Sequence, residues 1–393
     1  MLRYLVLGLS YFYAIANVNE SLLKLGLYVA VPLSFSLSFF CRKDNVFNNI
    51  YVITFCLLLS WIAFTWLTAE NSGVATAQMQ RLLGVFMMTI AVCNMATDAR
   101  NTPFLYGLYV FVFLTAVYYA YTHILTLQFN IASDRLNDDR LNANVLANYT
   151  FYATFAIYVL GQILFDNTVR RIFRLLFLFT IPISFIIALL TASRQVLLIQ
   201  VPLIATLLYV RYLMASTFKT KFIFIVGIII CTIALSGTVT EMYDDSYLKV
   251  RSEKSITDDG RFKVLKEAIT IGCENPIVGV GPGNFILHSS KRIFSHCSYT
   301  EVFANNGVIG LLIYLFLIWY FIRSQYLCFK ETRNKNVLAF LIFGVLFTVY
   351  NFLYVFYSDI WLMSFFIFVA FDSTSLENEN NELNGDFELR ENL

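Results

Sequence analysis

The stretch DDGRFKVLKEAITIGCENPIVGVGPGNFILHSSKRIFSHCSYTEVFANNGVIGL, residues 258–311, decides how this chain of 393 residues is organised. It holds most of the only long polar interruption in a sequence that is otherwise almost continuously apolar. Hydrophobic segments nearly fill the chain before this stretch, and a few more follow it. Because polar chemistry needs access to water, we look for function here first.

The composition indicates a membrane protein. Hydrophobic residues make up 58% of the chain, charged residues only 14%, and the mean hydropathy is +0.66, far above that of a soluble domain. A spanning helix needs about 20 predominantly apolar residues, and many stretches meet or approach that length. The sequence therefore predicts an all-α integral membrane protein, a polytopic bundle of about 12 transmembrane helices. The net charge of +2 is too small to indicate a nucleic-acid partner.

The predicted spans cover residues 4–18, 22–40, 50–68, 80–96, 103–125, 145–165, 173–191, 195–213, 221–239, 307–323, 337–355 and 358–371. Residues 1–371 thus form one membrane domain. Its one long external loop, 240–306, is inserted between spans nine and ten and is expected to carry short amphipathic helices. The acidic, Asn-rich segment 372–393 is expected to be a disordered cytoplasmic tail.

The distribution of positive charge predicts the topology. Connections rich in Lys and Arg alternate with connections that are poor in them, such as AENSG (69–73) and YSD (357–359). The positive-inside rule then places both termini in the cytoplasm. It also places residues 128–144, 191–194 and 240–306 outside.

Arg194 is an unusual residue because it stands between two apolar runs, with only Thr, Ala and Ser before it. A guanidinium at the membrane surface is costly unless it has a partner or lines a wet cavity. One interpretation is an arginine that snorkels to lipid phosphates. The other is an anion clamp, since the planar five-donor fork matches phosphate geometry.

The segment GRFKVLKEAITIG, residues 260–272, predicts an amphipathic helix lying flat on the outer membrane surface. Arg261 in its first turn adds a fixed cation to the positive end of a helix dipole, which suits a phosphate. The alternative is a basic face that touches lipid head groups. The apolar face holds Phe262, Leu265 and Ile269, and the polar face holds Lys263, Lys266 and Glu267.

The segment NPIVGVGPGNF, residues 275–285, is glycine-spaced but lacks the GK[ST] of a phosphate-binding P-loop. Its glycines predict a turn that returns the chain to the membrane. His296 follows, just before the tenth predicted span. A lone histidine is usually structural, but at an external membrane mouth it is a candidate general base.

These residues resemble the bacterial O-antigen ligase and O-antigen polymerase family over roughly residues 180–315, and over the whole chain by the number of spans. One departure is Cys297, where such proteins commonly have Asn after the histidine. Tyr299 and Glu301 agree with the family's His-Asn-x-Tyr-Leu-Glu run. The resemblance is carried by Arg194 in TASRQ, Arg261 in GRFKVLKEAI, the turn 276–281, and His296 followed by Gly307 and Gly310.

The resemblance implies an enzyme of the bacterial cytoplasmic (inner) membrane, with its active site facing the periplasm or the cell exterior. This glycosyltransferase would transfer or polymerise oligosaccharide from an undecaprenyl diphosphate carrier in surface polysaccharide (O-antigen or capsule) biosynthesis. Arg194 and Arg261 would hold the diphosphate and His296 would be the base, with no metal and no cofactor. Further candidates for substrate binding are Arg81, Lys263, Tyr299 and Glu301.

Three activities remain open at this point. The missing His-Asn dipeptide favours a repeat-unit polymerase over a ligase that attaches glycan to lipid A core or protein. A lipid-linked oligosaccharide flippase is the rival from another class, although a transporter places its charges near the midplane. Expected partners are the lipid-linked oligosaccharide, a glycan or lipid acceptor, membrane lipids and other polysaccharide-assembly proteins. Cys273 and Cys297 are either free or joined by a disulfide.

Overall fold

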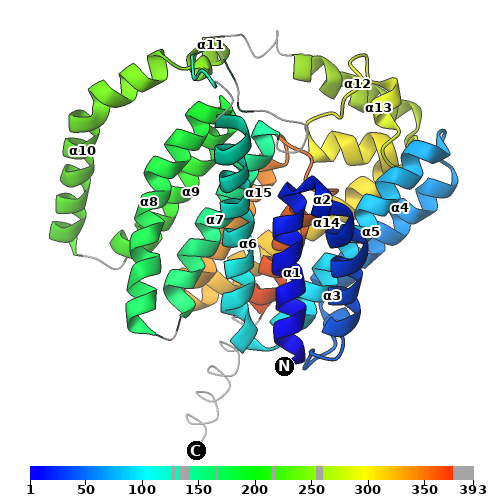
Figure 1. Ribbon diagram of the computed structural model, residues 1–393, viewed down its shortest axis with the longest axis horizontal. Coiled ribbons are helices and arrows are strands. Elements are labelled where there is room, and N and C mark those ends of the chain that lie inside the picture. Colours follow the sequence, from blue (N-terminus) through cyan, green and yellow to red (C-terminus); the bar gives the residue numbers. More distant parts are fainter. Residues whose placement is uncertain are drawn as a thin grey trace, which may run out of the picture. The chain divides into compact units, whose positions relative to one another are not determined.

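The computed structural model describes residues 1–125, 129–132, 134, 136, 142–164, 166–214, 217–253 and 260–374 (Figure 1). Within these ranges the regular structure is entirely helical, with no strand. The predicted all-α membrane fold is therefore confirmed.

Seven of the described helices are long and apolar enough to cross a membrane. Each of the seven lies at one of the predicted spans, and three shorter apolar helices lie at three more of them. The last two predicted spans correspond to α7 (Ala143–Ile163) and α10 (Phe218–Asp244). The seven are Ser21–Ser38, Ile50–Leu67, Ser72–Ala96, Ala99–Thr122, Asn167–Thr191, Val196–Leu213 and Ser298–Thr332, and the three are Leu2–Val18, Lys335–Tyr350 and Ile360–Thr374.

The chain divides into two compact units, of which unit 1 comprises Met1–Leu108 and Asp259–Leu393. The pairs α4 with α14, α12 with α14 and α14 with α15 are in contact, so α14 is central to this unit. Its helices are α1 (Leu2–Val18), α2 (Glu20–Leu25), α3 (Val31–Ser38), α4 (Ile50–Leu67), α5 (Ser72–Ala96), α12 (Gly260–Glu274), α13 (Phe285–His288), α14 (Ser298–Thr332), α15 (Lys335–Tyr350) and the last helix, Ile360–Thr374.

Unit 2 comprises Tyr109–Asp258, and α6 (Thr102–Tyr119) crosses the boundary. Helices α7 and α8 pack along each other, and α9 packs against both. The helices of this unit, besides α7 and α10, are α8 (Asn167–Thr191), α9 (Val201–Leu208) and α11 (Tyr247–Glu253).

Asn and Asp side chains cap the N-termini of many of these helices. Asn49 accepts from the Tyr51 N–H at the start of α4, and Asn71 accepts from the Val74 N–H at the start of α5. Such caps satisfy amide groups that have no partner inside the helix. They explain why short polar connections suffice between long apolar helices.

Helix α14 is broken at Gly307, whose φ of 67° and ψ of −171° fall in a region open essentially to glycine alone. The break leaves carbonyl groups without partners inside the helix, and N–H groups of the turn 276–281 donate hydrogen bonds to them. Val280 N–H donates to the Ala304 carbonyl at 3.0 Å, and Gly281 N–H donates to Asn305 at 2.9 Å. In return, Val308 N–H donates to the Pro276 carbonyl at 2.7 Å.

Glycines make this contact sterically feasible. A Cβ on Gly307 would overlap the Ile277 carbonyl, and a Cβ on Gly279 would overlap the backbone at Asn305. Gly279, Gly281 and Gly283 all have positive φ, between 68° and 95°. The predicted glycine turn is confirmed, and its partner is the backbone of α14.

At the end of unit 1 that carries the N-terminus, three cations surround the buried carboxylate of Asp98. Arg100 donates to it at 2.7 Å, Lys43 lies at 3.1 Å and Arg3 at 3.8 Å. The hydrogen bonds from Arg100, with those from Lys43, hold the pKa of Asp98 well below its usual range. The cluster joins three segments that the charge pattern predicts on the cytoplasmic side.

The predicted start of the tenth span at residue 307 coincides with the break in α14, and a further helical segment, 298–306, precedes the break. The last helix runs to Thr374 rather than 371 and begins after Asp359. The rest of the predicted tail, 375–393, and residues 258–259 before the predicted amphipathic helix lie outside the described residues.

Gly307→Ala should destabilise the protein by about 1–3 kcal/mol, because alanine is strained at this φ and its methyl group meets the Ile277 carbonyl. Gly8→Ala is the matched control, since Gly8 is helical and has open space around its Cα. Melting of the purified protein, followed by tryptophan fluorescence, should show a lower temperature for Gly307→Ala only. Equal melting temperatures for the two variants would show that the break does not need glycine.

Candidate active site

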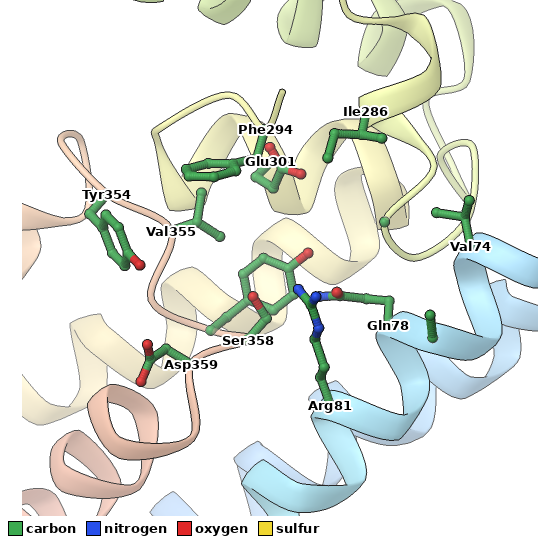
Figure 2. Close-up of a pocket in the computed structure, with 13 residues that line it drawn as sticks. Val74, Gln78, Arg81, Ile286, Phe294, Glu301, Tyr354, Val355, Ser358 and Asp359 are labelled. Atoms are coloured by element: carbon green, nitrogen blue, oxygen red, sulfur yellow. The ribbon is translucent and has the colours of Figure 1, made fainter. Parts of the chain in front are cut away.

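Unit 1 contains a pocket of about 360 Å³, which we call the α5 pocket. Three parts of the chain build it: the first turns of α5, the segment from Gly283 to the start of α14, and the connection between α15 and the last helix (Figure 2). It is lined by Val74, Ala77, Gln78, Arg81, Gly283, Ile286, Phe294, Glu301, Tyr354, Val355, Tyr357, Ser358 and Asp359.

Helix α5 contributes one face to the pocket. Val74, Gln78 and Arg81 recur at spacings of three and four residues, which puts them on the same side of a helix. Gln78 and Arg81 extend from α5 toward the other two parts of the pocket (Figure 2). Arg81, one of the predicted substrate-binding residues, therefore lies in the pocket.

Glu301, in the first turn of α14, is the second predicted residue in the pocket and is almost fully buried. One carboxylate oxygen accepts from the Ser295 N–H at 2.6 Å, and the other accepts from Asn305 Nδ2 at 3.0 Å. Glu301 thereby fixes the backbone immediately before His296.

Ser298 holds the connection 351–359 against the start of α14. Its N–H donates to the Asn351 carbonyl at 2.8 Å, and its hydroxyl donates to the Tyr354 carbonyl at 2.9 Å. The same hydroxyl accepts from the Phe356 N–H at 2.9 Å. This clamp sets the position of the pocket residues that follow it in the connection.

Asp359 ends that connection and caps the last helix. Its Oδ1 accepts from the Trp361 and Leu362 N–H groups, both at 3.0 Å. Burial of the carboxyl raises the pKa of Asp359 to about 6, although the two N–H bonds oppose this. Burial and the Asp359 carboxylate also raise the pKa of Tyr354, so this tyrosine stays neutral and can both donate and accept a hydrogen bond.

His296 lies beside the pocket, two residues after Phe294. The two rings are 4.3 Å apart between centroids, and Phe294 lines the pocket. The φ of His296 is 60°, a left-handed conformation that is uncommon for residues other than glycine. Strained backbone of this kind is often found at functional sites.

Arg261 and Lys263 lie on α12, which packs on α14 through Val264 and Ala268. Arg261 is partly buried and Lys263 is exposed, with its Nζ 4.0 Å from a Glu267 carboxylate oxygen. Glu267 also accepts from the Ser290 N–H, and the bonds to Ser290 lower the pKa of Glu267.

The apolar face predicted for α12 is left open by the protein. Phe262 and Ile269 are each 42% exposed, whereas Val264 and Ala268 are buried. The helix thus has a second apolar face that the amphipathic pattern did not reveal. The exposed face is the one available to a membrane surface.

Tyr299 belongs to the core of unit 1. It is buried, its hydroxyl donates to the Thr348 carbonyl at 2.9 Å, and its ring packs against those of Tyr314 and Phe352. These contacts give it a structural role in joining α14 to α15.

Arg194 lies in unit 2, between α8 and the π-helical turn Val196–Gln200. The helix α8 ends at a left-handed Ala192, and the neighbours Ser193 and Gln195 are buried while Arg194 is partly buried. Leu136 N–H donates to the Leu190 carbonyl at 2.9 Å, which brings the predicted external segment 128–144 to this turn.

The two cysteines of the predicted external loop are free thiols, Cys273 exposed and Cys297 buried. Cys297 precedes the first residue of α14, and its N–H donates to the Ser295 hydroxyl at 3.3 Å. The position where relatives commonly have Asn therefore faces the protein interior.

Sequence reasoning missed Gln78, Tyr354 and Asp359. One signal was present: Asp359 is an acidic residue in the YSD connection, which is predicted to be external and directly precedes an apolar helix. Its proximity to α5 could not be inferred, because the two segments are far apart in the chain.

The fold is that of a polytopic helical membrane protein, with a polar pocket formed where several interhelical connections meet. Residues 176–315 match the family described as O-antigen ligase. The match includes Arg194, Arg261, His296 and Glu301, and it confirms the predicted resemblance to the O-antigen ligase and polymerase family. No curated protein matches the chain.

Asp359→Asn should raise the melting temperature at pH 8 and change it much less at pH 4.5. A carboxyl whose pKa is raised loses stability as the pH rises from about 4 to about 6, and Asn keeps the helix cap without the charge. The measurement is thermal melting of both proteins at the two pH values. A difference that does not depend on pH would contradict the burial of a charged carboxylate.

Proposed function

We propose that the protein is an integral-membrane glycosyltransferase of the O-antigen ligase and polymerase type. It transfers oligosaccharide from an undecaprenyl diphosphate carrier to an acceptor hydroxyl, on the outer side of the cytoplasmic membrane, in O-antigen or capsule synthesis. One observation carries the proposal: the matched segment places His296 directly beside a pocket that contains Arg81 and Glu301.

The reaction divides into two tasks. The acceptor oxygen attacks the anomeric carbon of the donor sugar, the bond from that carbon to the diphosphate oxygen breaks, and the hydroxyl proton leaves. His296 takes this proton, because a neutral imidazole accepts one near ambient pH. The diphosphate leaves as an anion, and arginines compensate its charge without a metal ion.

Arg261 and Arg194 are the proposed ligands of the diphosphate. Arg261 lies in the first turn of α12, where the helix dipole also favours an anion. Arg194 lies in a tight turn between two apolar helices. Lys263 is solvent-exposed on the same helix as Arg261 and is proposed to attract the donor head group.

We propose a repeat-unit polymerase rather than a ligase, since Cys297 replaces the Asn that is common in ligases. Glycan analysis of a strain that lacks the protein tests this. Loss of long chains with retention of single repeat units supports a polymerase, whereas loss of all glycan from the lipid A core or from protein supports a ligase. Lipid-linked glycan that stays on the cytoplasmic side would instead identify a flippase.

His296→Gly should abolish transfer, and added imidazole should restore part of it. Glycine suits the left-handed backbone at this position, so the variant should fold, and the space left by the ring can admit imidazole. Transfer by the purified enzyme, measured with millimolar imidazole over a range of pH, should rise with the fraction of neutral imidazole. Full activity without imidazole would remove His296 from the reaction.

Arg194→Lys should lose most activity although the charge is kept, because an ammonium group cannot bind phosphate through a bidentate fork. Arg171→Lys is the matched control, since Arg171 is an exposed residue near the predicted cytoplasmic end of α8. Each variant is expressed in a strain that lacks the protein, and the length of the glycan chains is the measure of its activity. Normal chains with Arg194→Lys would assign Arg194 to lipid contact.

A further inference from the structure

We infer that the α5 pocket binds a sugar ring of the glycan through its hydroxyl groups, and that the diphosphate binds elsewhere. This inference deepens the proposed function, on which it rests for the source of the sugar. Three properties of the pocket support it: its charge, its hydrogen-bonding groups and its shape.

The charge of the pocket does not suit a diphosphate. Its ionisable side chains are the guanidinium of Arg81 and the carboxyl groups of Glu301 and Asp359, besides two tyrosines. The pocket thus holds one cationic side chain and two carboxyl groups. One guanidinium cannot balance a diphosphate, and an ionised carboxyl group beside it would repel the diphosphate. A neutral sugar would meet no such repulsion.

The hydrogen-bonding groups suit hydroxyls, which donate and accept together. Arg81 and Gln78 offer N–H groups on the α5 side, and Asp359 offers carboxylate oxygens on the opposite side (Figure 2). Both N–H groups that cap the last helix bond to Oδ1 of Asp359, so Oδ2 is left for a ligand among the described contacts. Tyr354 and Ser358 add hydroxyl groups, which can either donate or accept a hydrogen bond.

A carboxylate at Asp359 would strengthen the binding of a sugar. A charged hydrogen bond to a hydroxyl is about twice as strong as a neutral one, and Asn could supply only the neutral bond. Asp359→Asn therefore removes the stronger bond, while Asn can still cap the last helix.

The shape and the apolar walls also suit a sugar. A volume of about 360 Å³ lies at the small end of ligand pockets, which fits one ring of a glycan and not a long chain. Phe294, Ile286 and Val355 give the pocket apolar walls on which the C–H face of a sugar ring can pack (Figure 2). Phe294 also touches His296, so a sugar bound here lies next to the proposed base.

The test uses the full chain in detergent and, as the probe, the free oligosaccharide released by mild acid from the cell's lipid-linked glycan. Saturation-transfer NMR measures its binding, with inorganic pyrophosphate as the competitor. Wild type should bind the oligosaccharide, and Asp359→Asn should bind at least tenfold more weakly. Pyrophosphate should not displace the oligosaccharide. Displacement by pyrophosphate, or undiminished binding by Asp359→Asn, would overturn the inference.

A second pair of variants tests the pocket by filling it. Ala77→Leu places a larger side chain in the pocket and should abolish oligosaccharide binding, whereas Gln80→Leu alters an exposed residue of α5 outside the lining and should not. Binding by Ala77→Leu equal to wild type would overturn the inference.

These measurements need no donor lipid and no turnover. If the proposed transferase activity fails, the oligosaccharide still binds and Asp359→Asn still weakens it. If only the sugar site is wrong, the deletion strain still shows its glycan defect while oligosaccharide binding does not respond to Asp359→Asn or Ala77→Leu.

Discussion

The exchange of backbone hydrogen bonds between the turn 276–281 and the broken helix α14 is the constraint on which the rest of unit 1 depends. A helix that stops bonding to itself leaves carbonyl groups that cannot remain unsatisfied inside a protein. The turn satisfies the carbonyls of Ala304 and Asn305, and the indole of Trp61 donates to that of Asn306 at 2.8 Å. Only glycine permits the approach at Gly307, so the loop and the membrane helix fix each other's positions.

This junction explains where the α5 pocket forms. Glu70 N–H donates to the Val280 carbonyl at 3.3 Å, and the Glu70 carboxylate lies 2.8 Å from Nε2 of His288, so the segment after the turn is held to the start of α5. Asn305 accepts from the Phe285 N–H at 2.9 Å and donates to Glu301. The connection 351–359 is fixed on the other side by Ser298. Three connections that the charge pattern predicts outside therefore meet at one end of α14, as that pattern requires.

Those parts of the structure that depend on local sequence could be predicted. Hydropathy and length are properties of single segments, so the helix positions were found, and the spacing of Gly279, Gly281 and Gly283 was enough to predict a turn. The break at Gly307 could not be found in this way, since one glycine before an apolar run is equally consistent with the start of a span. The Asp359 carboxylate was missed for a different reason. Asp359 shares its pocket with Arg81, which lies far away in the sequence and reaches the pocket only through the packing of α5.

For the proposed donor, which is charged at the diphosphate and neutral at the sugar, Asp359 and Arg81 would favour binding of the neutral end. If Arg261 of α12 binds the diphosphate, as proposed, a further strong cation site at the sugar would hold the leaving group in the wrong place. A pocket with two carboxyl groups and a single guanidinium disfavours that binding mode and still offers donors and acceptors to hydroxyls. The donor would then bind in one orientation, with its diphosphate away from Glu301 and its sugar next to His296.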